Sequence, residues 1–138
     1  MKTKVLITGA GGFIGSNLLN YIQGLDNFEV LGIDNNPRIK NKSIKKLDIK
    51  SINTLSYDPD IIFHLAAQSR VQPSFDNPTK SVEDNVMGTL SVLEYARYND
   101  SKVIYAGSSS KHFNHSQSPY SSTKYMGENL CKMFKECF

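Results

Sequence analysis

The stretch that decides the fold is Thr8-Gly9-Ala10-Gly11-Gly12-Phe13-Ile14-Gly15-Ser16. It joins a short apolar run at residues 5–8 to an amphipathic run at residues 13–23. A brief apolar run ended by glycines predicts a buried β-strand, and apolar residues at helical spacing predict an α-helix. The stretch is therefore a tight turn from a strand into a helix. The apolar stripe expected on that helix consists of Phe13, Ile14, Leu18, Leu19 and Ile22.

The three glycines at positions 9, 12 and 15 suit a turn that approaches an anion. One glycine permits the tight turn, another lets the backbone approach a pyrophosphate, and the last lets helix and strand pack closely. The helix N-terminus adds free N–H groups and the positive end of its dipole. Ser16, not lysine, follows Gly15, which excludes a nucleoside-triphosphate P-loop. The turn predicts a dinucleotide site, and a tight turn without a ligand is the alternative.

Strand-like and helix-like segments alternate along the rest of the chain. This alternation predicts right-handed crossovers and an α/β fold with a doubly wound parallel sheet. The helix at 80–98 has an expected apolar stripe of Val82, Val86, Leu90 and Leu93. Further strands are predicted at residues 28–33, 44–49, 60–65 and 102–106. A helical turn is predicted at 51–55, and helices at 80–98 and from Tyr120 onward. Loops are predicted at 68–78 and 107–118.

Asp34 ends the second predicted strand, about twenty residues beyond the glycine turn. A carboxylate at this position can accept hydrogen bonds from ribose hydroxyls and would repel a 2′-phosphate, so it favours NAD over NADP. Arg38 lies nearby in the sequence and would weaken that preference. Asp34 can also serve as a turn-forming acid, and the two roles are compatible.

Tyr120 and Lys124 stand four residues apart on the last predicted helix and therefore share a face. A nearby ammonium favours the phenolate form of a tyrosine, which could then take a proton from a substrate hydroxyl. Ser108, Ser109 and Ser110 follow a predicted strand at the carboxyl edge of the sheet, where ligands bind in open α/β folds. A surface Tyr/Lys pair beside a flexible serine loop is the alternative for either segment alone.

The composition excludes several classes of function. The chain has 138 residues and a net charge of +3 with scattered basic residues, which fits one domain and does not point to nucleic acid. No signal peptide or membrane span is evident, so we expect a cytoplasmic protein with Cys131 and Cys137 reduced. No cysteine or acidic cluster stands near His112 and His115, so no metal site is expected.

These segments together resemble the extended branch of the short-chain dehydrogenase/reductase superfamily, which includes the nucleotide-sugar epimerases and dehydratases. The resemblance covers nearly the whole chain. Besides the glycine stretch and Asp34, the matching motifs are Asp48-Ile49, His64-Leu65-Ala66-Ala67, Asn85 with Gly88-Thr89, Tyr105 to Ser110, and Tyr120 to Lys124.

The resemblance implies a Rossmann fold that binds NAD and acts on a nucleotide sugar. It implies a catalytic set of Ser108, Tyr120 and Lys124, with Lys124 also bonding the nicotinamide ribose. A homodimer through the long helix and the tyrosine helix is the assembly it suggests. The cofactor-binding residues it implies are Gly9, Gly12, Phe13, Ile14, Gly15, Asp34, Asn35, Asp48, Ile49, Leu65, Ala66, Ala67, Asn85, Tyr120 and Lys124.

Two departures from the family shape the functional hypothesis. The family continues into a smaller substrate domain, so residues 1–138 are expected to form an NAD-binding domain truncated before it. Ser109 and Ser110 stand where 4,6-dehydratases carry acidic residues, which favours an epimerase over a dehydratase. The alternatives are a non-catalytic or incomplete dinucleotide-binding module and an NAD-dependent reductase of a small carbonyl compound.

Overall fold

The computed structural model describes residues 1–36, 41–112 and 114–138, and its centre is a parallel β-sheet. In the described residues the strand order is β3-β2-β1-β4-β5, which confirms the predicted doubly wound arrangement. The strands are β1 (Thr3–Thr8), β2 (Phe28–Asp34), β3 (Ile44–Lys46), β4 (Ile61–His64) and β5 (Lys102–Tyr105).

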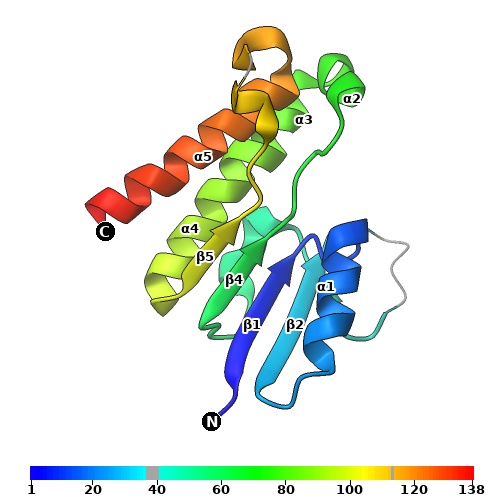
Figure 1. The fold of residues 1–138 in the computed structure, drawn as a ribbon, viewed down its shortest axis with the longest axis vertical. Coiled ribbons are helices and arrows are strands. Elements are labelled where there is room, and N and C mark those ends of the chain that lie inside the picture. Colours follow the sequence, from blue (N-terminus) through cyan, green and yellow to red (C-terminus); the bar gives the residue numbers. More distant parts are fainter. Residues whose placement is uncertain (37–40, 113) are drawn as a thin grey trace.

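Helices cover both faces of the sheet, and Figure 1 shows α1 (Phe13–Gln23) running alongside β2. Side chains alternate between the faces along β1. Val5 and Ile7 pack toward α1, whereas Leu6 packs toward the opposite helices. Besides α1, the helices of the described residues are η1 (Ile49–Thr54), α2 (Val71–Asp76), α3 (Pro78–Val82), η2 (Glu83–Met87), α4 (Gly88–Asn99), η3 (Ser109–His112), η4 (His115–Gln117) and α5 (Pro119–Cys137). None of the helices in the described ranges is long and apolar enough to cross a membrane.

The strand order places a switch point at the centre of the sheet. The chain moves outward from β1 to β2 and β3, and then returns past β1 to form β4 on its other side. Crossovers on the two sides of β1 leave a crevice beyond the carboxyl ends of β1 and β4, which is where ligands bind in such sheets. The glycine turn follows β1 directly and therefore borders this crevice.

The long helix differs from its prediction in one turn. It begins at Pro78 and contains a π-helical turn, η2, before α4. The extra residue in that turn shifts the faces of the helix, because a π turn closes with i→i+5 hydrogen bonds. The predicted stripe from Val82 to Leu93 was therefore wrong at its start: Val82 is 44% exposed, whereas Leu93 is buried.

Three other segments also differ from prediction, and one of them is the predicted loop at 107–118, which contains the short helices η3 and η4. The predicted loop at 68–78 contains the helix α2, which tolerates Pro73 because it is the third helical residue, where no intrahelical N–H bond is required. The predicted strand at 44–49 ends at Lys46 as β3. Asp48 then caps η1 by accepting a hydrogen bond from the backbone N–H of Lys50.

Candidate functional site

A cleft of about 350 Å³ lies beyond the carboxyl ends of β1, β2 and β4. The glycine turn forms one wall, and the segment after β4 forms another. Phe13 and Ile14 were predicted to join the apolar stripe of α1, but they are 86% and 66% exposed. They lie in the first turn of α1 and line the cleft, which fits their other predicted role as cofactor contacts.

The glycines of the turn have different structural roles. Gly9 has a φ of +69°, and a Cβ there would lie 2.7 Å from the backbone nitrogen of Ala66. A Cβ on Gly15 would overlap the carbonyl oxygen of Gly9, so this glycine lets α1 approach the turn. A Cβ on Gly12 would meet only the Gly9 oxygen, at 3.3 Å, and otherwise enter open space. Gly12 is therefore where the backbone leaves room for a ligand.

Asp34 connects the end of β2 to the glycine turn. Its carboxylate accepts hydrogen bonds from the N–H of Gly11, at 3.0 Å, and of Asn36, at 2.8 Å. The second bond confirms the predicted turn-forming role. Asp34 also lines the cleft, and a carboxylate has lone pairs for further donors. Arg38 lies outside the described residues.

Asp48 stands behind this wall and does not line the cleft. Burial alone would raise the pKa of Asp48, but the Lys50 N–H, the Asn35 amide and nearby lysine charges hold it below its ordinary value. The Asn35 amide donates to Asp48 at 3.3 Å, and Asn35 itself lines the cleft. Asp48 therefore supports the cleft wall through Asn35.

A buried histidine ties the two central strands to α4. The His64 ring nitrogens lie 2.8 Å from the Thr8 hydroxyl and 2.9 Å from the Thr89 hydroxyl. Thr89 donates its proton to the Asn85 carbonyl and Thr8 accepts from the N–H groups of Leu65 and Ala66. Consequently Nε2 of His64 carries the proton and donates to Thr89, while Nδ1 accepts from Thr8. His64 is therefore a strand histidine whose two ring nitrogens both have hydrogen-bond partners.

Asn85 lies in the π-helical turn and is 1% exposed. Its amide oxygen accepts from the Gln68 N–H at 2.7 Å, and its amide nitrogen donates to the Gln68 carbonyl and to the Thr123 hydroxyl. Asn85 therefore links the segment after β4 to α5. The structure gives it this linking role, and cofactor contact by Asn85 remains a prediction.

Two of the three predicted catalytic residues, Tyr120 and Lys124, lie in the first two turns of α5, and Ser108 lies in the segment after β5. Lys124 is buried, and its ammonium donates to the Ala106 carbonyl at 2.6 Å. Ala106 lines the cleft, so this ammonium lies directly behind the cleft wall. Tyr120 is half-buried in the first turn of α5. The Ser108 hydroxyl pairs with that of Ser110 at 2.8 Å.

Comparisons with known proteins identify the family of this chain. The sequence pattern of the NAD dependent epimerase/dehydratase family matches residues 5–138. The chain belongs to this family. It is 31% identical to a putative UDP-glucose 4-epimerase of Methanocaldococcus jannaschii, covering 97% of this chain and 52% of that protein. It is 35% identical to CDP-paratose 2-epimerase of Salmonella typhi, covering 88% and 41%.

The fold of this chain also resembles a solved structure that contains NAD. MoeE5 in complex with UDP-glucose and NAD superimposes with a TM-score of 0.80 at 29% identity, covering 95% of this chain and 48% of MoeE5. The chain thus spans about half the length of the relatives it matches. NAD is the cofactor of the family, and the open space above Gly12, beside Asp34, suits its pyrophosphate and ribose.

The structure brings most of the predicted cofactor residues together. Asp48, Asn85, Tyr120 and Lys124 do not line the cleft, whereas Ala106 does and was not predicted. The predicted residues that line it are Gly9, Gly12, Phe13, Ile14, Gly15, Asp34, Asn35, Ile49, Leu65, Ala66 and Ala67.

Sequence reasoning also missed Ser74, which supports the first turn of α5. Ser74 is fully buried in α2, and its hydroxyl accepts a hydrogen bond from the backbone N–H of Tyr120 at 3.0 Å. That N–H belongs to the first turn of α5, where no intrahelical acceptor exists. The two prolines around Ser74 indicated a loop, so no signal in the sequence linked this residue to α5.

Burial of His64 predicts a loss of stability in mild acid. Burial first, and the Lys124 charge second, lower the pKa of His64 from 6.5 to about 3. Between these values only the unfolded chain binds the proton, so stability falls as the pH drops from 6.5 toward 3. At about pH 5 the loss should be about 2 kcal/mol, and His64→Gln should abolish this loss while lowering stability at neutral pH.

Urea unfolding at neutral pH and at about pH 5 measures this effect. Ile62→Val is the matched control, since it weakens the same buried strand without changing a titratable group. The control should keep the acid dependence of the unaltered chain. Equal acid dependence in His64→Gln and the unaltered chain would refute the assignment of His64.

Proposed function

We propose that this chain is the cofactor-binding part of a nucleotide-sugar epimerase in which Tyr120 acts as the acid/base. The observation that carries the proposal is the bond from Lys124 to Ala106. This bond holds the Lys124 ammonium at the wall of the cleft that the glycine turn lines, and Tyr120 lies on the same helix as Lys124. The family and the named epimerases among its relatives support the reaction class.

In this mechanism the residues of the chain move and hold protons. Tyr120 takes the proton from a sugar hydroxyl as the carbon that bears this hydroxyl is oxidised to a carbonyl. It returns the proton to the same oxygen when the carbonyl is reduced from the other face. Lys124 follows Tyr120 by one turn of α5 and holds its ammonium at the wall of the cleft. The Ser108 hydroxyl, released from Ser110, holds the sugar oxygen. Bound NAD supplies a reversible hydride acceptor.

Ser109 and Ser110 support epimerisation over dehydration, because neither can serve as the carboxylate of an elimination step. Dehydratases occur among the relatives, including a dTDP-glucose 4,6-dehydratase of Haemophilus influenzae at 34% identity over 68% of this chain. Product analysis separates the two reactions, because dehydration removes water from the sugar whereas epimerisation conserves its mass.

Tyr120→Phe tests the acid/base role. The variant removes one hydroxyl and should lower the rate of nucleotide-sugar epimerisation by at least about a hundredfold while leaving NAD affinity unchanged. Tyr125→Phe is the control, because Tyr125 lies one residue beyond Lys124 on the same helix and its ring stacks on His115. Equal turnover in the Tyr120 variant and the unaltered chain would exclude the role. An inactive unaltered chain that binds NAD would favour the binding-module alternative, and turnover of small ketones alone would favour a reductase.

Most of the contacts that bind the nucleotide sugar are expected to come from outside residues 1–138. The relatives are about twice as long, and β5 pairs only with β4 among the described strands. Ile104 on β5 is 42% exposed, although parallel sheets are normally covered on both faces. NAD should therefore bind this chain more tightly than UDP-sugars do, and tight binding of a UDP-sugar alone would contradict this arrangement.

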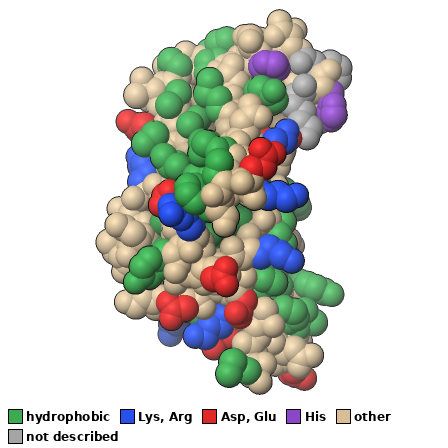
Figure 2. All heavy atoms as spheres, turned by 90° about the vertical axis from the view of Figure 1, so that its left-hand side faces the viewer, with side chains coloured by type: hydrophobic (Ala, Val, Ile, Leu, Met, Phe, Trp, Pro, Cys, Tyr) green, Lys and Arg blue, Asp and Glu red, His purple; other side chains and the backbone are tan. Residues whose placement is uncertain are grey.

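A homodimer through α4 and α5 completes the proposal. Figure 2 shows hydrophobic side chains gathered above the centre of the face that carries these helices. Met126 and Met133 on α5 are 49% and 44% exposed, and Met87 just before α4 is 49% exposed. Light scattering should give a dimer that Met126→Glu dissociates. A monomeric unaltered chain would remove this part of the proposal.

A further inference from the structure

Lys124 is a buried cation with no acidic partner in the described part of the chain. It is 6% exposed, and burial lowers its pKa from 10.5 to about 8. No carboxylate of the described residues lies within ion-pair distance of its ammonium. Among the described residues, the Ala106 carbonyl, at 2.6 Å, and the ring of Tyr105, whose centroid lies at 4.3 Å, contact the ammonium instead.

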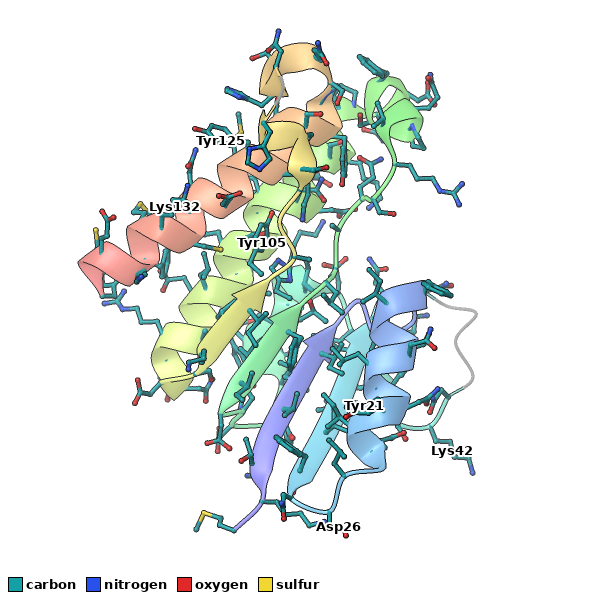
Figure 3. All side chains as sticks on the ribbon, in the orientation of Figure 1. Tyr21, Asp26, Lys42, Tyr105, Tyr125 and Lys132 are labelled. Carbon is teal, nitrogen blue, oxygen red and sulfur yellow. The ribbon has the colours of Figure 1, made fainter. Side chains whose placement is uncertain are left out.

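Tyr105 contacts both the side chain and the backbone of Lys124. Its ring faces the ammonium, and its hydroxyl donates to the backbone carbonyl of Lys124 at 3.2 Å. Figure 3 shows Tyr105 in the interior between the end of β5 and the helices α4 and α5. Gly127 makes this position available, because a Cβ there would overlap the Tyr105 hydroxyl. The tyrosine therefore fixes both the helix and the side chain of Lys124.

The other titratable groups near Lys124 supply little negative charge. His64 packs against Tyr105 at 5.7 Å between centroids and stays neutral, because burial lowers its pKa to about 3. Burial raises the pKa of the Cys131 thiol, so this group is protonated at neutral pH. Glu128 pairs with Lys132 at 3.2 Å. Burial first, and then Cys131, Tyr120 and Glu128, raise the pKa of Tyr105, which keeps it a neutral donor.

We propose that Tyr105 is a positioning residue that holds the Lys124 ammonium, charged, at the wall of the cofactor cleft. The face of an aromatic ring attracts a cation electrostatically, and the attraction grows when both are removed from water. The ring thus replaces the carboxylate that a buried lysine usually requires. This role rests on the proposed function of Lys124, but its physical content, the stabilised charge, can be measured without turnover.

The test follows the titration of Lys124 by NMR in protein with isotopically labelled lysine, with Lys124→Arg to assign the signal. The unaltered chain should titrate at about 8. Tyr105→Phe keeps the ring and should titrate close to that value. Tyr105→Leu removes it and should lower the pKa of Lys124 by about one unit. Ring-fluorinated phenylalanine at position 105 keeps the shape but weakens the negative ring face, and should give a value between the two.

Tyr95→Leu is the matched control, because Tyr95 is a buried tyrosine whose hydroxyl donates to the Leu55 carbonyl instead. It should destabilise the fold but leave the pKa of Lys124 in place. An unchanged Lys124 titration in the fluorinated protein would overturn the proposal, even if Tyr105→Leu failed to fold. If the unaltered chain failed to bind NAD while Lys124 titrated as expected, that result would instead count against the proposed function alone.

Discussion

Gly12→Ala is expected to weaken NAD binding by about tenfold to a hundredfold and to leave the chain folded. Gly12 has an extended backbone that any residue can adopt, and its added Cβ would lie 3.3 Å from the Gly9 oxygen and otherwise in open space. The unfolding free energy should therefore change by no more than about 1 kcal/mol. The same Cβ would occupy the place where the backbone approaches the pyrophosphate.

Calorimetric titration with NAD, together with urea unfolding, measures both effects. Gly24→Ala is the matched control, because Gly24 ends the same helix at the far side from the cleft and a Cβ there makes only an ordinary contact, at 3.4 Å. The control should bind NAD as the unaltered chain does. If Gly12→Ala bound NAD with unchanged affinity, the cofactor would not approach the chain at this turn.

Gly15→Ala, unlike Gly12→Ala, should act on the fold itself. It should lower the free energy of unfolding by about 3 kcal/mol or more. Its Cβ would overlap the Gly9 carbonyl oxygen and lie 2.8 Å from Cα of Ala10. Both are backbone atoms of the turn and Ala10 is fully buried, so neither can move aside without separating α1 from the sheet.

The urea midpoint of Gly15→Ala, followed by circular dichroism, measures this loss against that of Gly12→Ala. We expect the first variant to unfold at much lower urea or to be unfolded in its absence. Similar midpoints for the two variants would show that the close approach of α1 to the turn is not required for folding. The comparison separates the glycine that the fold needs from the glycine that the ligand needs.

The sequence predicted those features that depend on local patterns. The turn from Gly9 to Gly15, the alternation of strands and helices, and Asp34 at the end of β2 are each determined by residues close in sequence. The satisfied role of His64 could also be predicted, because a polar residue inside an apolar strand must find hydrogen bonds.

The features that were missed depend on contacts between distant segments. Ser74 supports Tyr120 across 46 positions, and α2 forms around it despite its prolines. The π-helical turn at Asn85 is stabilised by hydrogen bonds to Gln68 and Thr123, so the apolar spacing of the long helix could not reveal it. Packing of Tyr105 against Lys124 likewise joins a strand to a helix that follows it by a long loop.

Titration of the isolated chain with NAD and with NADP, by calorimetry, tests the central claim most directly. The cleft beside Asp34 predicts that NAD binds and that NADP binds more weakly, because the carboxylate repels a 2′-phosphate. Asp34→Ala should narrow the difference between the two affinities. Failure of NAD to bind, or equal affinity for the two cofactors in the unaltered chain, would contradict the account.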